Sequence, residues 1–336
     1  MAQYGVQWRM LTVRIPRYCA LFLVSMLACE TPSQTPTPQA DVVDLRVAYP
    51  VPEEGIQIRT PDLSVEPYEE VMYCYYDTYT GPPVGVVGML PLYSKTYGHH
   101  VFLKAANDAD DTPTGALVDC TSAEVEQMKE SVFVQAVHNY FPDGTGDWLS
   151  LFPGYAFRLE QNQRLKLDAH FINPTDSALL ANAAVNLELI PENEVEEWVG
   201  SFDLDGVNFE IPPGPNQSIS FDCALPEGSA VLSVGGHMHE NGTRYTVELI
   251  RGDTKIPLLD VPAWSEAYRY SPPMSNFWPG DIRIEEGDLI RTTCRWDNPT
   301  STPLSYPEEM CTTFGVATGL MSSFLCENGE VIRDGQ

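Results

Sequence analysis

Five of the six histidines fall in three tight groups: His99 with His100, His170 alone, and His237 with His239. Residues i and i+2 of a β-strand point to the same face, so His237 and His239 can present two imidazoles to one ion. His99 and His100 are neighbours, so they can share an ion only where their strand bulges or bends. The clustering predicts metal binding, because imidazole is the commonest metal ligand of proteins.

Met310 is a sixth candidate ligand because of its setting. It follows Glu308 and Glu309 and precedes Cys311, an odd position for a residue that only fills a hydrophobic core. A thioether is a soft, neutral ligand and favours Cu(I) over Zn²⁺, Ca²⁺ or Mg²⁺. The sequence has no acidic residue at zinc-hydrolase spacings such as HExxH, so that class lacks its signature.

The segments that contain these residues have the sequence pattern of short β-strands. Segment 164–170 alternates, with Leu165, Leu167 and Ala169 on one face and His170 on the other. Further strands are predicted over 230–234, 245–250, 256–260, 282–285 and 289–294. Glycine-containing turns at 251–253 and 286–288 predict two hairpins among them.

One helix is predicted, beginning with a capping box at Thr121 and Glu124 and continuing through Val125, Met128 and Val132. Strands at this density, separated by Gly, Pro and Asp turns, favour an all-β fold of two tandem antiparallel β-sandwiches. The acidic stretch at 191–201 separates two strand-rich halves. It predicts one domain over 42–196 and a second over 197–328.

Composition limits the function classes. The chain has 336 residues, 43% of them hydrophobic and 20% charged, which excludes a disordered polymer and a polytopic membrane protein. Its 19 basic and 47 acidic residues give a net charge of −28. Such a surface repels phosphate backbones, so we expect no nucleic-acid partner.

Residues 1–28 resemble a signal peptide, with a basic start and an apolar run over 18–28 that is shorter than the about 20 residues of a membrane-spanning helix. Met1 and Met10 both remain possible starts. Cys29 follows the small residue Ala28 as in a bacterial lipobox, which predicts a lipidated cell-envelope protein. Met26 is less usual than Leu at its position, so ordinary secretion stays open. Segment 29–41 is Pro/Thr-rich and predicts an extended tether.

Six cysteines remain after Cys29, and an even number in an exported chain predicts disulfides. Six cysteines allow 15 connectivities, so the sequence alone does not choose among them. None forms a CxxC pair, so a thiolate zinc site or a redox motif has no support.

Four motifs together resemble one family. They are Tyr97-Gly-His99-His100-Val-Phe-Leu, Leu167-Asp-Ala-His170, His237-Met-His239 and Glu308-Glu-Met310-Cys311. Their order, with gaps of about 70, 67 and 71 residues, is similar to that of the copper type II, ascorbate-dependent monooxygenases, which include peptidylglycine α-hydroxylating monooxygenase and dopamine β-monooxygenase. The resemblance covers about residues 42–326.

The resemblance implies two jelly-roll-like domains with a cleft between them and two copper ions. His99, His100 and His170 would hold the electron-transfer copper of the N-terminal domain. The catalytic copper, where O₂ binds, would be held by His237, His239 and Met310. The implied reaction is hydroxylation of a C–H bond of a small-molecule substrate with O₂, with ascorbate as the expected reductant. The implied disulfides are Cys74–Cys120, Cys223–Cys326 and Cys294–Cys311.

Three positions depart from the peptide-amidating member of the family. An Arg, an Asn and a Tyr that grip its substrate's carboxylate are replaced here by Gly235, Thr312 and Phe314. None of these can form a bidentate salt link, so we expect a neutral or apolar substrate and not peptidyl-glycine. Arg244 or Arg269 could restore such a clamp from elsewhere in the chain.

A second function class stays open. An exported, non-catalytic copper-binding module for buffering, delivery or adhesion would need the same kinds of ligand. Six ligands in two domains favour the enzyme, because a carrier needs only one site. The missing substrate anchor keeps the module as the alternative.

Overall fold

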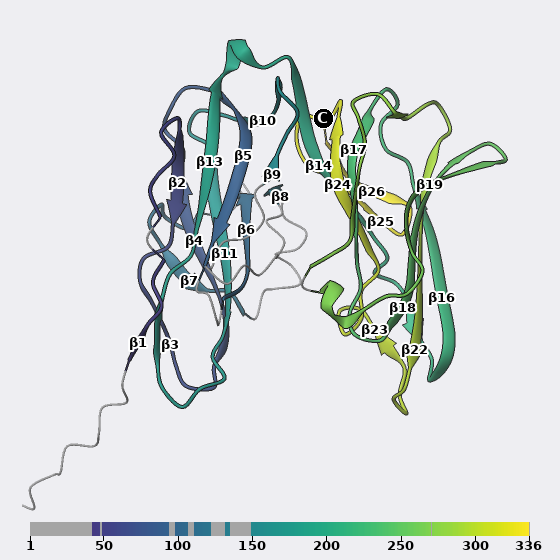
Figure 1. Cartoon of the computed structure of the whole chain (residues 1–336), viewed down its shortest axis with the longest axis horizontal. Helices are drawn as coiled ribbons and strands as arrows, with labels where there is room; N and C mark the ends of the chain where they lie inside the picture. The colour runs from purple at the N-terminus through teal and green to yellow at the C-terminus, as the bar shows by residue number, and fades with distance from the viewer. Residues whose placement is uncertain are drawn as a thin grey trace, which may run out of the picture. The chain divides into compact units, whose positions relative to one another are not determined.

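The computed structural model describes residues 42–47, 49–93, 98–106, 111–121, 132–134, 149–269 and 271–335. Residues 40–336 form one compact unit, and its described part is almost entirely β-structure, so the chain has an all-β fold (Figure 1). The predicted signal segment, Cys29 and the tether lie outside the described residues. Within the described ranges, no helix has the length and apolar character needed to cross a membrane.

A five-stranded antiparallel sheet carries two of the three histidine groups. In spatial order its strands are β7 (Leu117–Asp119), β4 (Glu70–Thr78), β11 (Arg164–Ile172), β6 (Gly98–Ala105) and β8 (Val132–Val134). The alternation in β11 places Leu165, Leu167 and Ala169 in the first hydrophobic core, as the sequence predicts. Val132 lies in a strand and not in the predicted helix, in keeping with its β-branched side chain; residues 122–131 lie outside the described part.

A second sheet has twelve strands and runs through both halves of the chain. Its main path is β2 (Gly55–Arg59), β13 (Ala184–Pro191), β5 (Val84–Leu92), β10 (Tyr155–Leu159), β14 (Glu197–Asp205), β24 (Thr312–Thr318), β17 (Ala230–His237) and β20 (Met274–Asn276). Four short strands join this path: β9 (Leu149–Ser150), β21 (Ile282–Arg283), β25 (Phe324–Glu327) and β26 (Glu330–Asp334).

The twelve-stranded sheet contains parallel pairs that the sequence did not reveal. β10 and β14 run parallel, with Tyr155 opposite Glu197 and Phe157 opposite Val199. β14 also pairs in parallel with β25. The sheet therefore continues across the predicted boundary between 196 and 197, and that boundary stays a prediction, as does the cleft.

The second half of the chain packs a four-stranded antiparallel sheet against the long one. In spatial order it contains β16 (Gly214–Cys223), β22 (Leu289–Asn298), β18 (Gly242–Arg251) and β19 (Thr254–Val261). Phe202 and Leu204 of β14 share the second hydrophobic core with Tyr245 and Val247 of β18. Side chains from two facing sheets that interdigitate in this way form a β-sandwich.

The turn at 286–288 does not make the predicted hairpin. β21, before it, pairs with β17 in the long sheet, whereas β22, after it, pairs with β16 and β18. Asp288 accepts a hydrogen bond from the backbone N–H of Glu285 at 2.8 Å and closes the turn, while Ile284 is buried in the second core. The turn is present, but the chain uses it to change sheets. The other predicted hairpin, β18–β19 around Gly252, does form.

The remaining elements are small. A three-stranded sheet contains β1 (Val43–Asp44), β12 (Leu179–Ala181) and β3 (Leu63–Val65), and a two-stranded one contains β15 (Glu210–Ile211) and β23 (Leu304–Ser305). The described residues also include the 3₁₀ turns η2 (Glu192–Glu194) and η3 (Glu266–Arg269).

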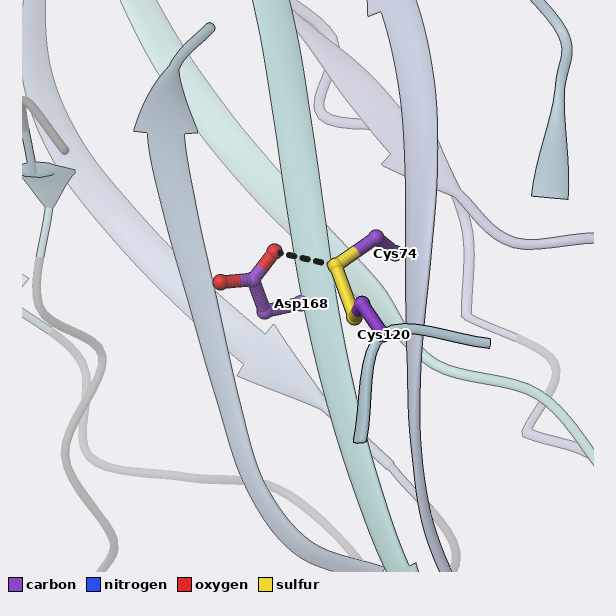
Figure 2. Close-up of side chains that lie close together, drawn as sticks. All are labelled: Cys74, Cys120 and Asp168. Carbon is purple, nitrogen blue, oxygen red and sulfur yellow. Dashed lines mark hydrogen bonds between the residues drawn. A yellow bond between two sulfur atoms is a disulfide. The ribbon is translucent and has the colours of Figure 1, made fainter. Parts of the chain in front are cut away.

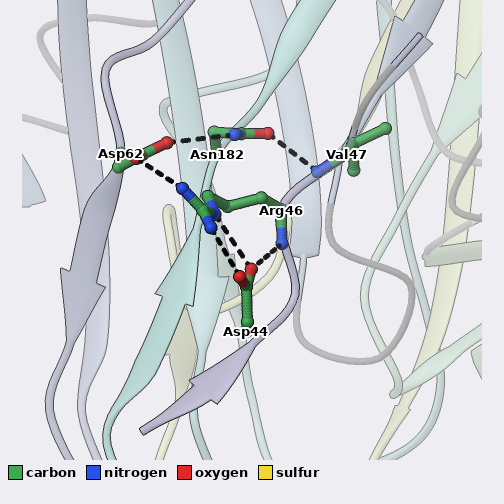
Figure 3. A network of polar contacts seen from close by, with 5 residues as sticks. All are labelled: Asp44, Arg46, Val47, Asp62 and Asn182. Atoms are coloured by element: carbon green, nitrogen blue, oxygen red, sulfur yellow. Dashed lines mark hydrogen bonds and ion pairs between the residues drawn. The ribbon is translucent and has the colours of Figure 1, made fainter.

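An ion-pair network lies where the described chain enters the fold (Figure 3). Arg46 Nη2 is 2.6 Å from Asp44 Oδ2, and its Nη1 is 3.0 Å from Asp62 Oδ2. Asn182 accepts a hydrogen bond from Val47 N at 3.0 Å and donates one to Asp62 at 3.4 Å. Exposed ion pairs of this kind contribute little stability, so the network mainly orients the entry of the chain.

Three disulfides join Cys74 to Cys120, Cys223 to Cys326 and Cys294 to Cys311. These are the pairs that the family resemblance implies. The first ties β4 to the residue after β7, and the other two lie in the second hydrophobic core.

Candidate metal centres

The first candidate centre lies where β6 pairs with β11. His170 is opposite His100, but the next residue of β11, Phe171, is opposite Gly98, so His99 is an extra residue in β6. Such a β-bulge is the local feature that the sequence requires if His99 and His100 are to bind one ion together with His170. The side chains of His99 and His100 lie outside the described part of the structure.

The His170 ring is held in a largely dry setting, with 7% of the residue exposed. Burial, with a smaller contribution from the positive charge of Arg269, lowers the pKa of His170 to about 4. Its Nε2 is 3.2 Å from Glu70 Oε1, so Nδ1 is the ring nitrogen that Glu70 does not engage. A neutral imidazole is the form that binds a metal ion, and this ring stays neutral well below neutral pH.

A buried ion cluster lies on the same face of β11. Lys104 Nζ is 2.6 Å from Asp168 Oδ2, and Lys166 Nζ is 3.8 Å from Asp168 Oδ1. Asp168 also lies 3.2 Å from the sulfur of Cys74, which is bonded to Cys120 (Figure 2). Cys74, Cys120 and Asp168 are the one group of three His, Cys, Asp or Glu in the described residues whose ligand atoms gather within 4.8 Å. Because its sulfurs form a disulfide, this group offers no thiolate to a metal.

The second candidate centre begins with two neighbouring imidazoles in an edge-on arrangement. His237 ends β17 and His239 follows two residues later, while Met238 between them is fully buried in the second core. The ring centroids of His237 and His239 are 5.2 Å apart, with their planes at 87°. Imidazole nitrogens bind ions at about 2.0–2.1 Å, so two rings on one tetrahedral ion have centroids about 5 Å apart. The centroid distance of this pair matches that spacing.

The tautomer of His239 is set by a backbone carbonyl. Its Nδ1 is 2.9 Å from the carbonyl oxygen of Glu308, which can only accept, so Nδ1–H donates and Nε2 carries the lone pair. Burial lowers the pKa of His239, although the Glu308 carbonyl opposes that shift. A carbonyl on one ring nitrogen is the usual outer partner of a metal-binding histidine.

The carboxylate of Glu309 joins the His239 segment to the Met310 segment. Its Oε2 accepts hydrogen bonds from the backbone N–H of His239 at 3.1 Å and from Trp296 Nε1 at 3.0 Å. Its Oε1 accepts from the backbone N–H and the side-chain amide of Asn241 at 2.9 and 2.7 Å. Met310, 7% exposed, follows directly in the chain. Sequence reasoning gave no role to Glu309, Trp296 or Asn241.

Two further contacts fix the strand end. Trp264 Nε1 donates to the carbonyl oxygen of His239 at 3.1 Å, and the Tyr245 hydroxyl donates to that of Thr312 at 2.8 Å. A Cβ on Gly236 would lie 2.1 Å from the Tyr245 ring. Only glycine lets β17 approach this ring so closely.

The residues around Gly235 leave no room for a side chain at this position. Gly235 is opposite Met274 on β20 and Phe314 on β24, and it lies on the same face of β17 as His237. A Cβ at Gly235 would lie 2.3 Å from Met274 Sδ and 2.5 Å from the Phe314 ring. Gly235 therefore lies in an apolar row between Met274 and Phe314.

Arg244 and Arg269, the two arginines considered as an alternative carboxylate clamp, each pair with an acidic residue. Arg244 Nη2 is 2.7 Å from Asp260, and Arg269 Nη1 is 2.8 Å from Glu240. The positive charge of Arg269 nevertheless contributes to lowering the pKa of both His170 and His239. The charge of Arg269 therefore acts on one histidine of each candidate centre.

Two acidic residues that the sequence analysis did not single out share the face of His237. Asp203 is opposite Phe314, and Asp205 is opposite Thr312, whose partner on the other side is His237. Burial raises the pKa of both carboxyls, and Asp203 raises that of Asp205 further. This face is therefore less negative than its two carboxyls suggest.

Three surface hollows of ≈ 520, 340 and 710 Å³ open beside β5 and β13. Their walls include Glu54, Val87, Glu188, Ile190 and Glu194. None of the three is lined by a candidate metal ligand.

No protein-family model and no curated protein matches the sequence. Among solved structures, the chain is similar to the major capsid protein P2 of bacteriophage PM2, with 10% identity, a TM-score of 0.36 and coverage of 79% of this chain and 97% of that one. It is also similar to the N-glycanase PNGase F, with 9% identity, a TM-score of 0.37 and coverage of 81% and 97%. At such identities and TM-scores, neither likeness bears on what this chain binds or does.

Proposed function

We propose that the chain is an exported, copper-dependent monooxygenase that hydroxylates a C–H bond with O₂ and a reductant such as ascorbate. The observation that carries the proposal is the second candidate centre, with two imidazoles 5.2 Å apart and the Met310 segment tied to His239 through Glu309. Two imidazoles and a thioether suit copper and favour Cu(I) over the hard divalent ions.

In the proposed reaction, one atom of O₂ enters a substrate C–H bond and the other leaves as water. The reductant supplies two electrons, and solvent supplies two protons. Copper, when bound, supplies the O₂ and one-electron chemistry. The chain supplies neutral imidazoles, because burial keeps His170 and His239 unprotonated near neutral pH. His99, His100 and His170 would hold the copper through which electrons enter.

The proposed substrate is neutral or apolar. Two residues from His237, the face of β17 presents Gly235 between Met274 and Phe314, and Met274 is 45% exposed. A charged carboxylate placed against this apolar row would lose its water without gaining a partner. This argument supports the exclusion of peptidyl-glycine.

The proposed location is outside the cytoplasm. Three disulfides support an oxidising compartment. A lipid on Cys29 would anchor the protein to a membrane, and simple secretion is the alternative.

The test uses the purified chain from residue 30, loaded with copper and given ascorbate. O₂ consumption and hydroxylated product are measured with neutral aromatic and aliphatic compounds and with acyl-glycines of rising length. We expect product from the neutral compounds, lost in His237→Ala and retained in His138→Ala. His138 is the sixth histidine of the sequence and belongs to neither proposed ligand set.

Two outcomes contradict the proposal. Efficient glyoxylate release from acyl-glycines would overturn the substrate class. Copper binding without any product, in wild type and variants alike, would favour the non-catalytic copper-binding module.

A further inference from the structure

We infer that Glu309 is the positioning residue of the second candidate centre and that its carboxylate sets the placement of His239 and Met310 before any metal binds. The inference rests on the proposed copper site and adds a residue that is not itself a ligand.

A buried carboxylate is costly unless its oxygens are hydrogen-bonded. Glu309 is fully buried, and no ion pair joins it to a Lys, Arg or His within the described residues. Four N–H donors, two on each oxygen, compensate for its burial instead. All four partners donate, and an ionised carboxylate is the side chain that can only accept. A glutamine at position 309 would replace one acceptor oxygen by an NH₂ group, which is itself a donor and cannot accept these hydrogen bonds.

The four donors come from two parts of the fold, the segment 239–241 and strand β22. One belongs to His239, two to Asn241 in the turn that follows, and one to Trp296 on β22. With both oxygens held, the carboxylate has one position, and the neighbouring Cα of Met310 is about 3.8 Å from that of Glu309. The hydrogen bond that His239 Nδ1–H donates to the Glu308 carbonyl joins the same two segments of the chain. Residues 239–241 and 308–310 are therefore held as one unit.

The experiment compares Glu309→Gln with Glu227→Gln in the full mature chain. Glu227 is the control, because it is an exposed glutamate in the turn before β17. Cu(I) affinity is measured by competition with a chromogenic chelator, and the thioether ligand by the Cu–S component of X-ray absorption. We expect Glu309→Gln to weaken Cu(I) binding at this centre about 10–100-fold and to reduce the Cu–S component, as outer-shell substitutions do. Glu227→Gln should match the wild type in both.

The outcomes separate this inference from the proposed function. A wild-type chain with no Cu–S component would defeat the proposed copper site. A wild-type chain with that component, and Glu309→Gln equal to it in affinity and spectrum, would overturn the role of Glu309. If Glu309→Gln does not fold, Trp296→Phe removes one donor and keeps an aromatic ring. We then expect Cu(I) binding about tenfold weaker, and unchanged binding would also overturn the inference.

Discussion

The two candidate centres are built by different means. At the first, the hydrogen-bonded register of β6 and β11 places His100 opposite His170, and a bulge adds His99. At the second, one histidine ends a strand and the other lies beyond it, and a buried carboxylate holds the second one to the Met310 segment. A backbone ladder does not depend on any single side chain. The second centre does, so single substitutions should damage it more.

The largest expected difference is in stability. Glu309→Ala removes the acceptor of four hydrogen bonds and leaves their donors unsatisfied, so we expect the free energy of unfolding to fall by at least about 3 kcal/mol. Glu70→Ala, beside His170 at the first centre, removes a side chain that is 63% exposed and should change it by less than about 0.5 kcal/mol. Denaturant unfolding of the metal-free chains measures both. Equal losses of unfolding free energy in Glu309→Ala and Glu70→Ala would contradict the proposed difference between the two centres.

A disulfide next to Met310 gives the second prediction. Replacing Cys294 and Cys311 by Ser opens a link spanning 17 residues and should cost about 3 kcal/mol in the loop-entropy description. Because Cys311 adjoins Met310, Cu(I) binding at the second centre should weaken as well. Replacing Cys74 and Cys120 is the control, which should destabilise the chain but spare the second centre. Loss of Cu(I) binding in the control alone would show that the local link does not matter.

The third prediction concerns pH. The pKa of His170 is about 4 in the folded chain and near 6.5 when unfolded, so between these values the unfolded state binds more protons. Stability contributed by His170 is therefore complete above about pH 6.5 and falls as the pH drops toward 4. An NMR titration of the metal-free chain measures this pKa, and a value near 6.5 would contradict the burial of the ring.

The smallest expected effect concerns Arg269, whose charge acts on a histidine of each centre. Arg269→Gln removes a positive charge, so the pKa values of His170 and His239 should both rise. Arg244→Gln is the control, because Arg244 pairs with Asp260 and contributes to neither shift. If only one histidine responds in the NMR titration, Arg269 belongs to one centre alone.

The sequence predicted the all-β class and the main strands because alternation is a local property. Leu165, Leu167 and Ala169 identify the buried face of β11 without any tertiary information. The parallel pairing of β10 with β14, and the change of sheet at 286–288, depend on contacts between distant segments that no local pattern records.

The candidate ligands could be proposed from spacing, but their supports could not. Glu308 and Glu309 are adjacent and chemically identical, yet only the second is buried among N–H donors. Glu309 turns inward to the N–H donors of Trp296 and Asn241. No local sequence pattern links Glu309 to either residue. The bulge at His99 was required by the metal hypothesis, but its presence follows from how β6 pairs with β11.

The most direct measurement is the copper content of the purified chain and two variants. We predict two copper ions per wild-type chain. Met310→Ala should weaken Cu(I) binding at one site and leave Cu(II) bound at His99, His100 and His170, whereas His170→Ala should do the reverse. One copper per wild-type chain, or loss of both ions from either variant, would contradict two separable sites.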